Sequence, residues 1–266
     1  MTQPVTVNGT RAWRKIYDNR ERRLRLAALR FIARRLDLPP LLPPPHYAGE
    51  AARRTESTRI RKLGALGVTV PEILDERDNM LVLSDLGPTL SESLRQTRDD
   101  PRRRDALVSA AAAAINDVHR RGGYLSQPWP RNLTVHEGGI GFLDFEEDPG
   151  EVMSLAHAQA RDWLLFAYGT MRFYRDRPET LAGVLRRVLR HAQQDTVSGM
   201  ARVAERLRPL ARGLGRLGAS AGELSQVLGV IRSALPALIG VLLLCLGLDW
   251  LDDGEFDLIE DLVELF

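Results

Sequence analysis

The stretch YLSQPWPRNLTVHEGGIGFLDFEED, residues 124–148, carries the strongest information on the fold. Its segments NLTV and IGFLDF flank HEGG, and two apolar runs joined by a short loop with glycine are typical of a β-hairpin. Asn132 begins this hairpin and Asp144 lies near its end, so the hairpin is expected to bring the two side chains together.

The region before this hairpin begins with a second one. VTVNGTRAWRKIYD, residues 5–18, alternates on both sides of an Asn-Gly pair, the strongest short signal for a tight hairpin. Residues 21–36 are predicted to form an arginine-rich helix, which the proline run at 38–45 must end because proline lacks a backbone donor. The predicted apolar stripe of that helix consists of Leu24, Ala27, Ala28, Phe31 and Ile32.

The middle of the chain returns to strands and then becomes helical. A helix from about residue 50 to 66 is expected to stop at Gly67, a plausible C-terminal cap. VTVPEIL (68–74) and MLVLSDLG (80–87) indicate two strands joined by a polar turn at Asp75 to Asn79. After Leu90 the pattern is helical apart from the 132–145 hairpin, so the predicted class is α+β.

Composition limits the functions that the chain can have. The 266 residues carry a net charge of only +2, so a basic surface for nucleic acid is not required and nucleic acid is an unlikely partner. The single cysteine, Cys245, cannot form an internal disulfide, which fits a reducing compartment. Because the N-terminus lacks the features of a secretory signal, the expected location is the cytoplasm.

One apolar run, ALPALIGVLLLCLGL at residues 234–248, has two interpretations. It is uncharged but shorter than the roughly 20 residues that a membrane-spanning helix needs. One interpretation is a span or membrane-embedded helix that attaches the protein to the cytoplasmic membrane. The other, which we favour, is a helix buried in the protein or facing a partner.

The order of these signals resembles that of a protein-kinase-like fold. The chain is similar, over roughly residues 5–175, to the atypical small kinases, namely the lipopolysaccharide-core (Kdo and heptose) kinases and the kinase subunit of the tRNA-modifying KEOPS complex. This resemblance implies two lobes, a small strand-rich one at 1–84 and a helical one at 85–210. Residues 211–266 would be a C-terminal helical extension that docks a membrane or a protein partner.

The resemblance also implies an ATP site. Lys15, in AWRKIY, matches the strand lysine that holds the ATP phosphates, and Glu56 matches the helix glutamate that pairs with it, with Glu50 as the competing candidate. The adenine would be read by backbone groups of a hinge segment. That segment consists of Ser84, Asp85 and Leu86.

The remaining matches lie around the hairpin. Asn132 and Asp144 correspond to the two Mg²⁺ ligands of the family, and Asp162 corresponds to the helix aspartate that braces the catalytic loop. His119 fits the helix end before that loop and is expected to be a structural residue. Gln127 occupies the place of the catalytic aspartate, and a neutral amide cannot take a proton from an acceptor hydroxyl. Glu146, Glu147 or Asp148 is the alternative source of a carboxylate nearby.

Two functions follow from these residues. The first is an ATP- and Mg²⁺-dependent phosphotransferase acting on a sugar or lipid-linked hydroxyl, or on a protein serine or threonine. The second is a pseudokinase, a nucleotide-binding or scaffold module in which the change at Gln127 has removed catalysis. A basic nucleic-acid-binding function rests on arginine content alone and ranks last.

Overall fold

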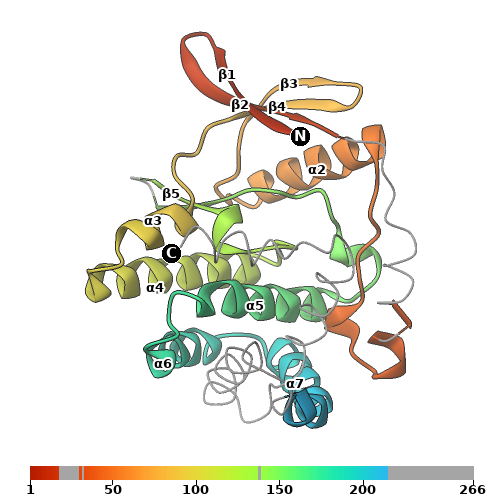
Figure 1. The fold of residues 1–266 in the computed structure, drawn as a ribbon. Helices are drawn as coiled ribbons and strands as arrows, with labels where there is room; N and C mark the ends of the chain where they lie inside the picture. The colour runs from red at the N-terminus through yellow and green to blue at the C-terminus, as the bar shows by residue number, and fades with distance from the viewer. Residues whose placement is uncertain (18–29, 32, 137–138, 215–266) are drawn as a thin grey trace.

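The computed structural model describes residues 1–17, 30–31, 33–136 and 139–214. Within these residues the protein is α+β, as predicted, with a four-stranded antiparallel sheet, a two-stranded sheet and several helices. The four-stranded sheet and helix α2 lie together at the top of Figure 1, and the longer helices fill its lower part. The two-stranded sheet lies between them.

The first hairpin of the four-stranded sheet agrees with the prediction. Strands β1 (Thr2–Val7) and β2 (Thr10–Ile16) pair antiparallel, with Val7 opposite Thr10. Asn8 and Gly9 form the turn with φ values of +51° and +79°. These are conformations that asparagine and glycine adopt most easily in a tight hairpin. The strand order β1-β2-β4-β3 then places β2, which carries Lys15, against β4.

The second hairpin begins later than predicted. Its strands are β3 (Ile73–Arg77) and β4 (Met80–Ser84), so the strand predicted at 68–74 starts later than expected and the turn predicted at 75–79 is confined to Asp78 and Asn79. Pro71 has no amide to donate to a ladder, so residues 68–71 are not part of a strand. β3 lies at the edge of the sheet and contains the polar residues Asp75, Glu76 and Arg77, because one face of an antiparallel sheet can be exposed to water.

Helix α2 (Gly49–Ala65) packs against this sheet and ends close to where the sequence predicted. Its buried face includes Ala52, Ile60 and Leu63, together with the polar residues Glu56 and Arg59. Gly67 follows with φ +71°, the left-handed conformation that commonly stops a helix. The helix therefore presents one apolar stripe and two charged groups to the interior.

The segment between β2 and α2 is only partly described. Residues 30–31 and 33–35 are helical, whereas residues 18–29 and 32 of the predicted 21–36 helix lie outside the described residues. Phe31 was predicted to face the core, but it is 69% exposed, and Ala33 is the buried residue of this turn. The proline run forms a short 3₁₀ helix, η1 (Pro39–Leu41), which contacts α5.

The helical part is built around α5 (Leu155–Met171). Its residues Trp163 and Phe166 are among the largest fully buried side chains. Around it lie α3 (Leu90–Gln96), α4 (Pro101–Arg120), α6 (Pro178–Leu189) and α7 (Gln194–Leu214). Among the described residues, no helix is long and apolar enough to cross a membrane. The apolar run at 234–248 lies outside the described residues.

The 124–148 stretch contains the predicted hairpin between these helices. After the 3₁₀ helix η2 (Pro130–Asn132), strands β5 (Leu133–His136) and β6 (Gly139–Phe142) pair antiparallel, with Leu133 opposite Phe142. β6 ends two residues before Asp144, which has φ +66°. This left-handed conformation is uncommon for a residue with a side chain, and such strained positions gather at functional sites.

Candidate functional site

Three carboxylates converge on the ammonium group of Lys15. Nζ lies 2.7 Å from Oδ1 of Asp144, 2.8 Å from Oε2 of Glu56 and 3.3 Å from Oε2 of Glu146. Strand β2 carries the lysine, α2 carries Glu56, and the segment after β6 carries the other two acids. Glu50, the competing candidate for the lysine's partner, is instead an exposed residue that binds Arg53 and Arg54.

The surroundings determine the charge of this cluster. Burial lowers the pKa of Lys15, but Glu56, Asp144 and Glu146 outweigh it and hold that pKa well above its usual value. For Asp144, burial opposes ionisation, and the charge and hydrogen bond of Lys15 outweigh it, so its pKa is lowered. Burial raises the pKa of Glu56, which is only 1% exposed, although Lys15 counteracts the effect. The ammonium is therefore charged at any physiological pH.

Asn132 and Asp144 lie side by side, as the hairpin predicted. Nδ2 of Asn132 donates to the backbone oxygen of Gln127 at 3.0 Å and to Oδ2 of Asp144 at 3.3 Å. Because Nδ2 of Asn132 already donates to two oxygens of the protein, Oδ1 is the side-chain atom that is available to bind a cation. A carboxylate and an amide oxygen fit Mg²⁺, which favours hard oxygen ligands. When bound with ATP, Mg²⁺ would supply charge stabilisation to the phosphates.

The loop before the hairpin is braced by a buried carboxylate. Asp162 of α5 is 0% exposed, and its two oxygens accept hydrogen bonds from the amides of Leu125 and Ser126 at 2.7 and 2.9 Å. His119 of α4 lies 2.9 Å from the same carboxylate. These contacts are those expected for Asp162 and for a structural His119. They fix the backbone of residues 125–126, where Ser126 has φ +84°.

Gln127 follows this braced segment, and both its backbone and its side chain are engaged. Its backbone oxygen accepts from Asn132 and from the amide of Trp129 at 2.8 Å. Its side chain lies close enough to the carboxyl of Glu147 to lower the pKa of that group. The residue in the predicted base position is thus held beside a carboxylate that the resemblance did not single out.

The predicted hinge segment is tied to the sheet. The amide of Ser84 donates to the backbone oxygen of Glu72 at 2.9 Å, and its hydroxyl accepts from the Glu72 amide at 2.8 Å. These groups are therefore not available to an adenine ring. Asp85 accepts from the indole of Trp13 at 3.1 Å and pairs with Arg11 at 3.3 Å. The backbone of Asp85 and Leu86, the other two predicted hinge residues, follows the end of β4 at Ser84.

Arg59 is a buried contributor to the site that the sequence reasoning missed. It lies one turn after Glu56 on α2 and donates to the backbone oxygen of Tyr124 at 2.6 Å and to the Ser126 hydroxyl at 3.3 Å. Its guanidinium also stacks over the ring of Tyr124 at 4.0 Å. The signal was the three-residue spacing from Glu56, which places both on one face of a helix.

Replacement of Arg59 by lysine is expected to lower the free energy of unfolding by about 1–2 kcal/mol, because an ammonium cannot reproduce the planar stacking or both donated bonds. Urea denaturation followed by circular dichroism measures this change. Arg54→Lys, on the exposed face of the same helix, is the control and should leave the stability within about 0.5 kcal/mol. Equal effects of the two substitutions would contradict a special role for Arg59.

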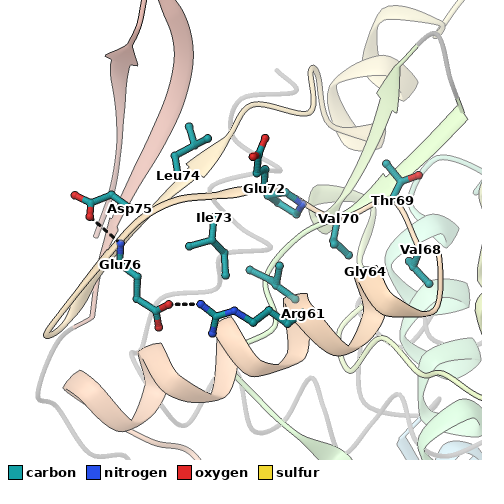
Figure 2. Close-up of a pocket in the computed structure, with 12 residues that line it drawn as sticks. Arg61, Gly64, Val68, Thr69, Val70, Glu72, Ile73, Leu74, Asp75 and Glu76 are labelled. Atoms are coloured by element: carbon teal, nitrogen blue, oxygen red, sulfur yellow. Dashed lines mark hydrogen bonds and ion pairs between the residues drawn. The ribbon is translucent and has the colours of Figure 1, made fainter.

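A pocket of about 720 Å³ lies on the other side of α2, between this helix, the 68–72 segment and β3. Figure 2 shows Val70 and Ile73 pointing toward the helix, and Arg61 bound to Glu76 across the end of the pocket. Its lining contains none of the predicted site residues. The pocket is therefore separate from the cluster around Lys15.

Comparisons with known proteins give little further direction. No protein-family model matches the chain. An uncharacterized protein of Haemophilus influenzae is 26% identical to it over 112 residues, 42% of this chain and 43% of that protein. The chain thus matches less than half of that relative's length. The name of the relative states no activity, so the functional argument rests on the site itself.

Proposed function

We propose that the protein is an ATP- and Mg²⁺-dependent phosphotransferase with a two-lobed, kinase-like fold. The observation that carries the proposal is the meeting of Lys15 with both Glu56 and Asp144, at 2.8 and 2.7 Å. The three residues come from a strand, a helix and the end of a hairpin that lie far apart in the sequence. Protein kinases require this ion pair and this aspartate together, to position ATP and its metal ion.

Each group has a defined task in such a reaction. The ammonium of Lys15 holds phosphate oxygens as a point charge, and Glu56 fixes its position. Asn132 and Asp144 hold Mg²⁺ against the same phosphates. Since phosphoryl transfer depends mainly on positioning and charge stabilisation, these four side chains supply most of what the chemistry needs. The acceptor in this proposal is a sugar or lipid-linked hydroxyl, or a protein serine or threonine.

A nucleotide-binding pseudokinase is the second candidate function, and Gln127 favours it. An amide in the place of the catalytic aspartate cannot accept the proton of an acceptor hydroxyl. The two functions share the ATP site and differ in turnover. In either, residues 211–266 would serve to dock a membrane or a protein partner.

Binding of Mg²⁺ and ATP is expected to raise the melting temperature of the full chain. At a ligand concentration ten times Kd, mass action adds about 1.4 kcal/mol. For a chain of this size that corresponds to roughly 2–4 °C. Asp144→Asn should remove the magnesium-dependent part of this shift, because it takes away the charge that holds the ion.

Thermal denaturation with ATP and Mg²⁺, with ATP alone and with neither separates these contributions. Asp75→Asn, which alters a surface ion pair with Arg77 on β3, is the matched control and should keep the full shift. A wild-type chain whose melting temperature does not move at millimolar Mg²⁺ and ATP would rule out both the phosphotransferase and the pseudokinase.

A further inference from the structure

We propose that the carboxylate of Glu147 is the general base that accepts the proton of the acceptor hydroxyl, in place of the aspartate that Gln127 has replaced. This inference rests on the proposed phosphotransferase function and names a further catalytic residue for it. Gln127 cannot accept a proton, and the carboxylate that does so in its place comes from another segment of the chain.

Contacts from the loop that carries Gln127 and from α5 surround Glu147. The side chain of Gln127 lies close enough to the Glu147 carboxyl to lower the pKa of that group. The hydroxyl of Ser126 donates to the backbone oxygen of Glu147 at 2.9 Å. From α5, the guanidinium of Arg161 approaches Oε2 at 3.7 Å. Glu147 is thus fixed next to the position from which a base would act.

The two oxygens of Glu147 have different surroundings. Oε2 is buried, faces Arg161 and has no hydrogen-bond partner within the described part of the chain. The side chain as a whole is 17% exposed, so it is not sealed from solvent. This is the arrangement that a positioned base needs.

The neighbouring acids are occupied elsewhere. Glu146 lies 3.3 Å from the ammonium of Lys15. Asp148 accepts hydrogen bonds from the Tyr124 hydroxyl and from the amide of Gly150. Of the three acids that follow Phe145, Glu147 is the one that contacts Gln127.

The charged surroundings of Glu147 suit this task. Burial raises the pKa of its carboxyl, and the charge of Asp144 adds to the rise. Arg161 and the side chain of Gln127 lower the pKa again, as does His46. A base with a pKa moved toward neutrality accepts a proton more effectively than an ordinary glutamate.

The step is balanced in atoms and charge. The acceptor oxygen forms a bond to the γ-phosphorus of ATP, and the bond from that phosphorus to the β,γ-bridging oxygen breaks. Its electron pair leaves with ADP, and the acceptor proton passes to Glu147, which later releases it to solvent. With water as acceptor, the same step gives inorganic phosphate.

The test follows the γ-phosphate of radiolabelled ATP in the full chain at saturating Mg²⁺ and ATP. It measures label released as inorganic phosphate and label transferred to the chain itself. Glu147→Gln is expected to lower the combined rate by about 10²–10⁴-fold, the usual contribution of a general base. Its Kd for ATP with Mg²⁺ should stay within about twofold of wild type, because the ATP contacts are untouched. Glu151→Gln, an exposed acid bound to Tyr47, is the control and should keep the full rate.

A second variant keeps the test decisive. Gln127→Asp combined with Glu147→Gln returns a carboxylate to the loop and should recover much of the lost rate. Wild-type activity in Glu147→Gln, or a loss of ATP binding that accounts for its lower rate, would overturn the role of Glu147. So would a wild-type chain that binds ATP with Mg²⁺ and transfers no phosphate, whereas a chain that does not bind ATP would overturn the proposed function itself.

Discussion

Replacement of Lys15 by methionine is expected to abolish the thermal stabilisation by ATP and Mg²⁺ and to lower the stability of the free protein. The ammonium is the cation that faces Glu56, Asp144 and Glu146 together. Without it, Glu56 remains as a buried carboxylate with its charge uncompensated. Breaking a buried ion pair by removing one partner costs about 3–5 kcal/mol. Urea denaturation measures the loss of stability, and the thermal shift measures the loss of ATP binding.

A double substitution separates these two effects. In Lys15→Met with Glu56→Gln, no buried charge is left unpaired at position 56, and stability should return close to that of wild type. ATP binding should stay lost, because the phosphates have no cation to meet. Lys62→Met removes the other lysine of the chain, which is exposed on α2, and should change neither quantity. Binding of ATP by Lys15→Met at wild-type affinity would contradict the proposed site.

The residues that meet at this site were predictable because their chemistry and order are unusual in this chain. Lys15 is one of two lysines among many arginines, and Asn132 and Asp144 flank a hairpin whose turn signals are local. The residues of a tight turn predict a hairpin independently of the tertiary structure around it. The contacts among Lys15, Glu56, Asn132 and Asp144 then follow from the placement of the two hairpins and α2.

What sequence reasoning missed depends on tertiary contacts. Nothing local distinguishes Arg59 from the arginines around it, and only the position of the Tyr124 loop makes it a buried donor. Sequence reasoning named Glu146, Glu147 and Asp148 as alternative carboxylates but could not choose among them, and the position of Gln127 beside Glu147 distinguishes this one. The start of β3 was predicted too early because the apolar residues of 68–74 were given more weight than Pro71, which has no backbone N–H to donate within a sheet. Phe31 was placed on the apolar face because the helical period alone does not show which face of a helix is covered, and its side chain is 69% exposed.

The buried carboxylate of Asp162 provides the second large expected effect. Asp162→Ala removes the acceptor of the Leu125 and Ser126 amides and of His119, and all three groups lie in the interior. Each buried donor left without a partner costs about 1–3 kcal/mol. We therefore expect a loss of roughly 3–9 kcal/mol, a large part of the 5–15 kcal/mol that stabilises a typical domain. The change should appear as a lower midpoint of urea denaturation with an unchanged slope.

Asparagine at position 162 gives a finer test, because an amide keeps one acceptor oxygen but turns an NH₂ group toward the remaining donors. Asp162→Asn should therefore lose nearly as much stability as Asp162→Ala, although it is almost the same size. Asp117→Asn, at a surface pair with Arg120 and Arg121 near the end of α4, is the control and should cost less than about 1 kcal/mol. If Asp162→Asn were as stable as wild type, the carboxylate would not be what holds the 125–126 backbone. The left-handed conformation of Ser126 would then need another source of stabilisation.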